Sequence, residues 1–457
     1  MEYFARLLSP AHGQPWARLM IIVLLSFASA CSPLPGHWRP GWNEHKSEGT
    51  PIAETAASWM MTDLETQDGR FIGLAISGGG SRAANFGGAV MLELQQRGLL
   101  NQVDVISGVS GGTLPAVYYG LGDKAGPFEA EAVRKTLGYD FQRNWLWRWL
   151  LPHNIFRFWF TDFTRSDIMV QVFNAHLTHK ATFADLRPHP KILLNSTIHN
   201  DHTRFTFTDD RFASLHSNLA MHYVANAVNA SSAFPGAFED VTLENYSPQD
   251  PAALKALGVE PVKYLHLYDG GPIDNLGIQA IVEYLNRNVT GTRGAKAFPH
   301  GCLIFVVDAT PASEHPELND MQSSRQVVDY FIDTNVLDAM DAMLIESRRS
   351  NLVQLGIPPE KQDREVHGHF AINDQTGCGC EIRHIALRHL IYMSESAEAP
   401  GLAYRATRIN TKFWLSKEEQ DDLFMAAKLL VKELDEDHLL PGSDSKPTCD
   451  RRGQGNE

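Results

Sequence analysis

The stretch that decides the fold is Asp104–Ala116, DVISGVSGGTLPA, in which one serine stands among glycines. Val103–Ile106, VDVI, is predicted as a short strand, and the segment after Gly112 favours a helix. Ser110 therefore falls on the turn between a strand and a helix. Glycines relieve crowding on such a strained turn and leave the serine Oγ exposed, as in a nucleophile elbow. The Gly108-x-Ser110-x-Gly112 pattern alone is weak, and this context strengthens it.

The same succession of elements occurs about thirty residues earlier in the chain. Phe71–Ile76, FIGLAI, is an apolar run that predicts a strand, and Ser77–Gly80 is a glycine turn. A helix is expected from about Phe86 to Arg97, ending at Gly98. Strand, glycine turn and helix thus occur twice in succession, which predicts an α/β fold with a mostly parallel sheet.

Downstream patterns predict further strands and helices. Residues 191–208 favour a hairpin with its turn at Asn200–Asp201, and two more apolar runs favour strands, at 264–268 and 302–307. Helical patterns cover residues 321–354 and 416–434, and the second begins with the capping box Ser416-x-x-Glu419.

A serine nucleophile needs a base and a site for the oxyanion. Gly78, Gly79 and Gly80 lie between a predicted strand and a predicted helix, so their backbone N–H groups can point at one spot. Arg82, two residues on, is placed for a phosphate or carboxylate group. Asp269 follows a strand and precedes two glycines, where its carboxylate can face the site-bearing edge of the sheet. Asp-Gly is also a common β-turn sequence, so the residues alone do not decide whether Asp269 is the base.

Other kinds of site compete with this interpretation. Gly78-x-Gly80-x-x-Ala83 satisfies a relaxed dinucleotide fingerprint, but no acidic residue ends a second strand about 20 positions on. A metal cluster at His199-Asn200-Asp201-His202 is less favoured than a solvated loop, because a hairpin turn is predicted there.

A Ser-His-Asp esterase is the nearest catalytic rival. Several histidines follow Asp269 in the chain, and no pattern singles one out as the base: His300, His367, His369, His384 and His389.

Three motifs in order resemble those of the patatin-like phospholipases: GGGSR at 78–82, GVSGG at 108–112 and DGG at 269–271. The surrounding ISGGGSRAANFGGAV, ASSAFPGAFEDV and DGGPIDNLG are similar to bacterial members of that family. The resemblance covers about residues 70–310 and implies a three-layer α/β/α fold with a mostly parallel central sheet.

The resemblance also implies a Ser-Asp dyad, with Ser110 as the nucleophile and Asp269 as its general base. The expected reaction is hydrolysis of an acyl ester, by a phospholipase, lysophospholipase or lipid esterase, through an acyl-enzyme on Ser110. A carboxylate is a weak base for a hydroxyl, so burial must raise its pKa or its contact with Oγ must be short.

The resemblance implies roles for the neighbouring residues as well. Gly78, Gly79 and Gly80 would form the oxyanion hole, helped by the N–H of Gly111, and Arg82 would set the hole or bind the head group. No motif asks for a metal or another cofactor. Acyl transfer to another acceptor also fits these motifs, as does a catalytically silent membrane-associated binding protein on the same fold.

The N-terminus predicts export. Residues 19–30 form an apolar run after Arg6 and Arg18, too short to span a bilayer and typical of a signal peptide. Cys31 follows Ala30 directly, as in a bacterial lipoprotein signal, although ordinary signal peptidase would cut the same bond. We expect a protein of the bacterial periplasm or outer membrane, lipid-anchored at Cys31, with a membrane lipid or another acyl ester as substrate.

The net charge bears on nucleic-acid binding, and the cysteine content bears on disulfides and metal binding. The formal net charge of −14 is unsuited to nucleic acid, which needs a basic surface. With Cys31 acylated, four cysteines remain whose pairing is left open, and they favour a disulfide or free thiols over a metal loop: Cys302, Cys378, Cys380 and Cys449.

The most aromatic stretch comprises Trp145–Leu151 and Ile155–Phe160, in which arginines alternate with rings. Such composition suits a membrane interface or a lid over an acyl pocket, and a buried helical segment is the alternative. The expected organisation of the chain is a signal peptide at 1–30, a tether and lead-in at 31–68, a catalytic domain at 69–310, a mainly helical extension packed on the core at 311–440 and a disordered tail at 441–457.

Overall fold

The computed structural model of the 457-residue chain describes residues 42–43, 55, 57–60, 69–235, 237–248, 261–288, 298, 301–312, 334–371, 379–393, 399–437 and 440. Several expectations lie outside these residues: the signal peptide, most of the tether, Cys31, His300, Cys378, Cys449 and the tail at 441–457.

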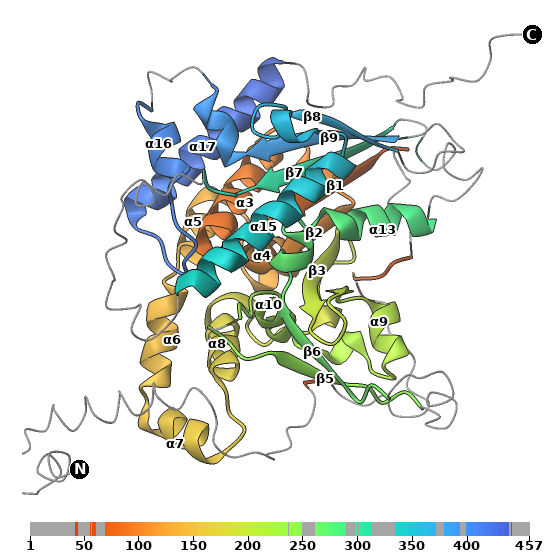
Figure 1. The fold of residues 1–457 in the computed structure, drawn as a ribbon, viewed down its shortest axis with the longest axis vertical. Helices are drawn as coiled ribbons and strands as arrows, with labels where there is room; N and C mark the ends of the chain where they lie inside the picture. The colour runs from red at the N-terminus through yellow and green to blue at the C-terminus, as the bar shows by residue number, and fades with distance from the viewer. Residues whose placement is uncertain are drawn as a thin grey trace, which may run out of the picture.

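A nine-stranded mixed sheet forms the centre of the molecule (Figure 1). Its strands lie in the order β5-β6-β3-β2-β1-β7-β9-β8, and β4 pairs with β3. The five central strands β3, β2, β1, β7 and β9 are mutually parallel, and antiparallel pairs complete both edges. The strands are β1 Phe71–Ile76, β2 Val105–Val109, β3 Lys191–Ile198, β4 Arg204–Thr206, β5 Val241–Glu244, β6 Tyr264–Asp269, β7 Cys302–Asp308, β8 His367–Ala371 and β9 Gly379–Ala386.

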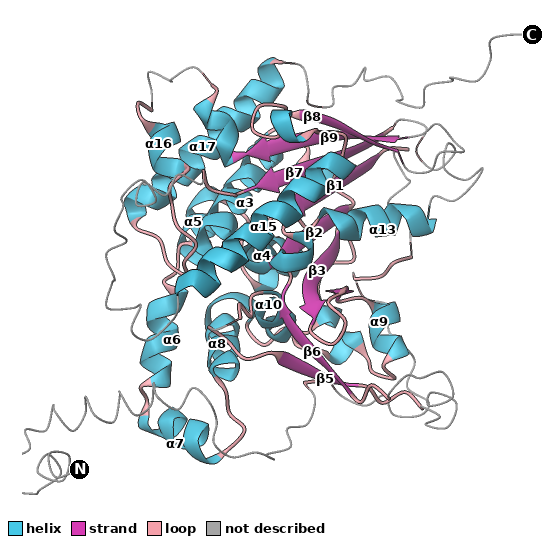
Figure 2. Ribbon diagram, viewed as in Figure 1, coloured by secondary structure: helices cyan, strands magenta, loops and turns pink. Residues whose placement is uncertain are grey.

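Helices cover both faces of the sheet (Figure 2). The helices are α3 Gly80–Gln96, α4 Thr113–Leu121, α5 Ala130–Leu137, α6 Phe141–Trp149, α7 Pro152–Phe160, α8 Arg165–Phe173, α9 Asp209–Ser214, α10 Val224–Ser231, α12 Gly271–Asp274, α13 Ile278–Asn288, α15 Thr334–Gln354, α16 Leu402–Ala406 and α17 Lys417–Glu436.

Alternation along β1 separates two apolar cores. Leu74 and Ile76 face the larger core, which α3, α4, α5, α10 and α17 complete, whereas Phe71 and Ala75 face the second core under α13 and α15. Successive side chains of a strand point to opposite faces, so an entirely apolar strand such as FIGLAI must be covered on both sides. The predicted three-layer α/β/α fold is confirmed.

Local expectations hold with shifted boundaries. β3 and β4 form the predicted hairpin, and α17 begins after a capping box at Ser416 and Glu419. The first helix, however, begins at Gly80 rather than near Phe86. Glycines weaken a helix intrinsically, and here tertiary packing overrides that preference, because Gly80, Ser81 and Arg82 are all buried.

The C-terminal part joins the sheet instead of only packing on it. Helices α15, α16 and α17 fit the expected helical character, but β9 pairs in parallel with β7 and β8 pairs with β9. The expectation of a mainly helical extension missed these two strands. His367–Ala371 is mostly exposed, so it lacks the apolar run by which a strand is recognised in a sequence.

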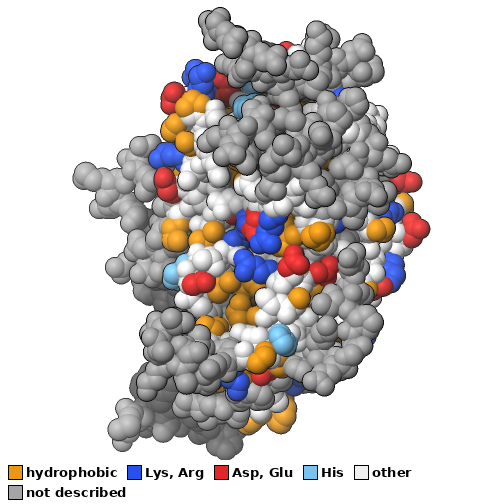
Figure 3. Space-filling view, turned by 90° about the vertical axis from the view of Figure 1, so that its right-hand side faces the viewer, with side chains coloured by type: hydrophobic (Ala, Val, Ile, Leu, Met, Phe, Trp, Pro, Cys, Tyr) orange, Lys and Arg blue, Asp and Glu red, His pale blue; other side chains and the backbone are white. Residues whose placement is uncertain are grey.

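Basic and acidic side chains lie next to one another on the face shown in Figure 3. Arg204 and Arg287 both pair with Glu283 of α13. The positive charges of Arg204 and Arg287 are therefore neutralised by a carboxylate of α13.

A disulfide joins Cys302 of β7 to Cys380 of β9, with 4.5 Å between the two Cα atoms. The sequence left this pairing open, because the two cysteines are 78 residues apart and become neighbours only through the β7–β9 pairing. The bond closes a large loop and covalently fixes the strand that the extension adds to the sheet.

We predict that the double substitution Cys302→Ala and Cys380→Ala lowers the free energy of unfolding by about 2–4 kcal/mol, because the crosslink restricts the unfolded chain. Urea unfolding of wild type and variant measures the difference. A reductant should lower the wild-type midpoint and leave the variant unchanged. Equal midpoints under oxidising conditions would contradict the prediction.

Candidate active site

Ser110 occupies a sharp turn directly after β2. Its φ of 50° lies in the left-handed region, which is uncommon for a residue with a side chain. One turn of 3-10 helix, Ser110–Gly112, then leads into α4. The turn is crowded, since a Cβ on Gly108 would lie 2.8 Å from the Gly112 carbonyl oxygen. The structure thus has the strand–turn–helix geometry of a nucleophile elbow.

Two hydroxyl groups hold the backbone of this turn. The N–H of Ser110 donates to Ser231 Oγ at 2.8 Å, and Thr113 Oγ1 donates to the Ser110 carbonyl oxygen at 2.6 Å. Ser231 in turn donates to the carbonyl oxygen of Asn195 on β3. No motif in the sequence indicates a role for Ser231, although it lies in the ASSAFPGAFEDV segment. No spacing rule links a serine 121 residues away to the elbow.

Asp269 reaches Ser110 from an antiparallel strand. β6 runs against β3 with Asp269 opposite Ser196, while Val109 of β2 pairs with Asn195. β6 therefore ends at the level where β2 ends. The predicted location is correct, but its cause is different, because the parallel-strand rule does not apply to β6.

The two side chains are in direct contact. Ser110 Oγ donates to Asp269 Oδ2 at 2.8 Å, and the N–H of Gly271 donates to Asp269 Oδ1 at 2.8 Å. Both side chains belong to buried residues. Burial raises the pKa of the Asp269 carboxyl to about 6, and the hydrogen bonds from Gly271 and Ser110 lower it by less. The short contact and the raised pKa that a carboxylate base requires are both present.

The backbone of the first glycine turn, Ser77–Gly80, lies directly against the backbone of the elbow. A Cβ on Gly111 would lie only 2.0 Å from the carbonyl oxygen of Gly80. In the part of the chain that the structure describes, the N–H groups of Gly79, Gly80 and Gly111 donate to no protein acceptor. These groups are suitable donors for an oxyanion beside Ser110. Gly78 departs from the expectation, since its N–H donates to the Asn275 carbonyl oxygen at 2.9 Å.

Arg82 braces this turn from inside the protein. Its Nε donates to the Ala309 carbonyl oxygen at 2.6 Å and its Nη1 to that of Ile409 at 2.5 Å. A Cβ on Gly79 would lie 2.8 Å from Arg82 Nη2, so the guanidinium lies against the turn. Of the two roles expected for Arg82, the geometry fits setting the hole, and head-group binding remains a prediction.

The C-terminal extension contributes backbone to the same turn. The N–H of Ser81 donates to the Lys412 carbonyl oxygen at 2.8 Å, and that oxygen would lie 2.5 Å from a Cβ on Gly80. Sequence analysis missed this contact, because carbonyl groups leave no signature in a sequence.

Asn275 is a second residue that sequence analysis left without a role. Its Oδ1 would lie 2.7 Å from a Cβ on Gly78 and 3.2 Å from one on Gly271. Its N–H donates to Ser347 Oγ of α15 at 3.2 Å. Asn275 thus connects the oxyanion turn, the Asp269 turn and α15.

Within the described residues, no histidine hydrogen-bonds to Ser110 or Asp269. His384 instead contacts Asp308 Oδ2 at 3.0 Å, and Arg348 of α15 donates to the same oxygen at 2.6 Å. Burial raises the pKa of the Asp308 carboxyl, but these two partners hold it well below its usual range. The cluster anchors α15 to the end of β7.

Neither metal-like motif gathers ligands in the described residues, which hold no group of three His, Cys, Asp or Glu side chains able to bind an ion. His199 lies on the hairpin turn and contacts Asp240 at 2.8 Å. Cys380 is engaged in the disulfide.

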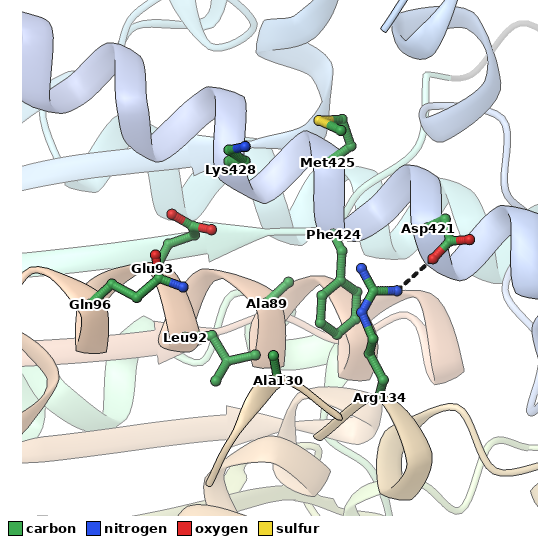
Figure 4. Close-up of a pocket in the computed structure, with 10 residues that line it drawn as sticks. All are labelled: Ala89, Leu92, Glu93, Gln96, Ala130, Arg134, Asp421, Phe424, Met425 and Lys428. Carbon is green, nitrogen blue, oxygen red and sulfur yellow. Dashed lines mark hydrogen bonds and ion pairs between the residues drawn. The ribbon is translucent and has the colours of Figure 1, made fainter. Parts of the chain in front are cut away.

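A surface pocket of about 340 Å³ lies between α3, α5 and α17, away from the elbow (Figure 4). Arg134 crosses it, donating to Asp421 at 2.6 Å, with its guanidinium carbon 3.7 Å from the centre of the Phe424 ring. Arg134 is already paired, and the residues that line this pocket include no nucleophile with a base beside it. The Ser110–Asp269 pair is therefore the better candidate for chemistry.

Residues 74–282 match the family model described as patatin-like phospholipase. This segment, which contains the elbow, the glycine turn and Asp269, is a patatin-like phospholipase domain. A comparison with curated proteins finds no match.

Solved structures resemble the chain distantly. A human GIVD cytosolic phospholipase A2 is 13% identical with a TM-score of 0.47, covering 83% of this chain and 61% of that one. VipD from Legionella pneumophila is 12% identical with a TM-score of 0.33, covering 90% of this chain and 73% of that one. The chain thus spans about three fifths of the human protein, and such low similarity transfers no residue roles.

We predict that Gly111→Ala lowers ester hydrolysis by about 100-fold or more, because the new methyl would displace the Gly80 carbonyl and spoil the alignment of the oxyanion donors. The initial rate on a soluble acyl ester measures the effect. Circular dichroism checks that the variant is folded.

Gly98→Ala is the matched control. Its methyl would meet nothing within 4 Å, but its φ of 70° makes alanine strained there. The control should lose about 1 kcal/mol of stability and keep wild-type activity. Full activity of Gly111→Ala would show that the two turns need no such contact.

The pH dependence of activity should report Asp269. The base must be ionised to accept the proton, so kcat/KM should rise with pH through about 6 and then level off. A pH-rate profile on a substrate without titratable groups tests this. A profile already flat at pH 5 would contradict Asp269 as the base.

The same pKa predicts an effect on stability. A carboxyl whose pKa is raised from 3.8 to about 6 adds stability that is present below pH 4 and lost as the pH rises through about 6. Asp269→Asn lacks this loss, so its unfolding free energy relative to that of wild type should rise by about 2–3 kcal/mol between pH 4 and 8. Urea unfolding at the two pH values measures it, and a constant difference would refute a buried, raised carboxyl.

Proposed function

We propose that this protein is a serine acyl hydrolase that cleaves acyl esters of lipids through an acyl-enzyme on Ser110, with Asp269 as its base. The observation that carries the proposal is the 2.8 Å hydrogen bond from Ser110 Oγ to Asp269 Oδ2 within a patatin-like phospholipase domain. The N–H groups of Gly79, Gly80 and Gly111, which donate to no acceptor among the described residues, support the proposal.

In the first half of the reaction, Ser110 Oγ attacks the acyl carbonyl carbon while its proton passes to Asp269 Oδ2. The carbonyl oxygen gains negative charge, which the N–H groups of Gly79, Gly80 and Gly111 stabilise. The tetrahedral species then collapses, and the leaving alkoxide takes the proton from Asp269.

In the second half, water attacks the acyl-enzyme, with Asp269 again accepting the proton. The acyl-oxygen bond to Ser110 breaks, and the proton returns to Ser110 Oγ. Gly271 serves both halves, because its N–H holds Asp269 Oδ1 and leaves Oδ2 directed at the serine.

Export and lipid anchoring at Cys31 remain part of this proposal, supported by the sequence of residues 1–31 alone. No helix among the described residues has the length and apolar character needed to cross a membrane. An acyl group on Cys31 would hold the domain near lipid esters.

Labelling with a fluorophosphonate probe tests the proposal. Wild-type protein should react covalently at Ser110, and Ser110→Ala should take no label. Asp269→Asn should label at least about 100-fold more slowly, because the base that deprotonates Oγ is absent. Mass spectrometry of the labelled peptide identifies the modified residue.

Ser107→Ala serves as the control, because Ser107 lies on β2 three residues before Ser110 and its Oγ donates to the Gly277 carbonyl oxygen. It should keep most of the labelling. If folded wild type takes no label with or without detergent, the hydrolase proposal fails and a binding protein on this fold becomes the better explanation.

A further inference from the structure

Large apolar side chains are exposed along one continuous part of the chain, the helices α6 and α7. We call residues 141–160 the arm. Seven of its large apolar side chains are exposed in the folded chain: Leu146, Trp147, Leu150, Leu151, Phe156, Trp159 and Phe160. Trp147 is 62% exposed, Phe156 61% and Phe160 67%. Single exposed apolar residues are ordinary, but a continuous group of them marks an interaction surface.

The opposite side of the arm is firmly attached to the protein. Trp149 is buried with Phe163 and Ile168 in a small separate core, against which Trp145 packs. Asn154 is buried and donates to the Arg148 carbonyl oxygen at 2.7 Å, which fixes the corner between α6 and α7. In Figure 1, α7 lies at the lower edge of the molecule, away from β1 and β7. The exposed rings thus belong to a built surface.

The charge of the arm is opposite to that of the whole protein. Residues 141–160 contain Arg143, Arg148 and Arg157 and no Asp or Glu, in a chain whose net charge is −14. None of the three arginines forms an ion pair with another residue of the described structure. On the face of Figure 3, by contrast, arginines lie next to carboxylates.

We infer that the arm docks this protein on a phospholipid bilayer that carries anionic lipids. The inference rests on the proposed function, because it specifies where the lipid substrate meets the enzyme. Helices that lie in a membrane surface combine Trp, Phe and Leu with Arg or Lys, as the arm does. A second copy of the chain fits less well, since two arms face to face would bring six arginines together with no carboxylate from either arm.

The arm is connected to the elbow by a short path. The Trp145 ring packs edge-on against Phe238, with 5.7 Å between the ring centres. Phe238 lies only seven residues after Ser231, which accepts the N–H of Ser110. Seven residues span at most about 25 Å, so Phe238, which contacts the arm, lies within that distance of Ser231 beside the elbow.

Vesicle binding tests the inference. The triple substitution Trp147→Ser, Phe156→Ser and Phe160→Ser should weaken binding to equimolar phosphatidylglycerol–phosphatidylcholine vesicles by about tenfold or more. Every protein in this assay carries Ser110→Ala, so that the vesicles stay intact. Every protein also carries Cys31→Ser, so that no acyl group is attached at the expected lipidation site.

Tyr392→Ser with Tyr404→Ser is the matched control, because these rings are exposed to a similar degree on other elements. It should bind vesicles as wild type does. Replacing the three arginines of the arm by glutamine should abolish the preference for vesicles containing phosphatidylglycerol over pure phosphatidylcholine. Added salt should weaken the binding of wild type but hardly that of the glutamine variant.

Hydrolysis separates this inference from the proposed function. With Ser110 restored, the triple variant should cleave the soluble ester p-nitrophenyl butyrate within about twofold of wild type, and vesicle phospholipid about tenfold more slowly. If wild type fails on the soluble ester, the proposed function is wrong while vesicle binding still decides the docking. Equal vesicle binding by wild type and the triple variant overturns the inference. So does a result in which wild type forms a dimer, the triple variant is a monomer, and neither binds vesicles.

Discussion

The contact between Ser110 Oγ and Asp269 Oδ2 depends on the unequal lengths of adjacent strands. β3 continues three residues beyond the last position at which it pairs with β2, and β6 pairs with that projecting part from the opposite direction. A nucleophile after a parallel strand and a carboxylate at the end of an antiparallel one therefore meet at the same level. Backbone hydrogen bonds along β3 fix the separation, so no flexible loop has to position the base.

The oxyanion turn depends on the parts of the chain that follow the patatin-like segment. Gly80 lies between Gly111 on one side and the Lys412 carbonyl on the other, and neither contact leaves room for a side chain. Arg82 connects the same turn to the carbonyl oxygens of Ala309 and Ile409. The proposed catalytic residues lie within 74–282, yet their geometry requires backbone from beyond residue 300. The segment and its extension are thus one structural unit at the site.

The sequence was sufficient for features that depend on local pattern. The apolar strands, the elbow at Ser110 and the carboxylate after β6 follow from short motifs. Contacts between distant segments were not predictable: Ser231 on the elbow, Asn275 beside Gly78, and the β9 strand that carries Cys380. Each arises from the register of the sheet, which no short motif encodes. Gly78 shows the same limit, because the bond from its N–H to the Asn275 carbonyl is invisible in GGGSR.

Two features of this protein oppose stability, and the proposed function gives both the same physical origin, a lipid substrate. Asp269 is a carboxyl in a dry site, where its charged form is disfavoured, and that same dryness gives it the basicity that a hydroxyl nucleophile requires. The arm leaves aromatic rings in water, where their exposure is unfavourable, unless an apolar phase is at hand. Under the proposed function, a lipid ester must leave water in order to reach Ser110. A buried base and an exposed apolar arm are therefore complementary, since the first needs a water-poor site and the second brings the protein to the phase in which the substrate resides.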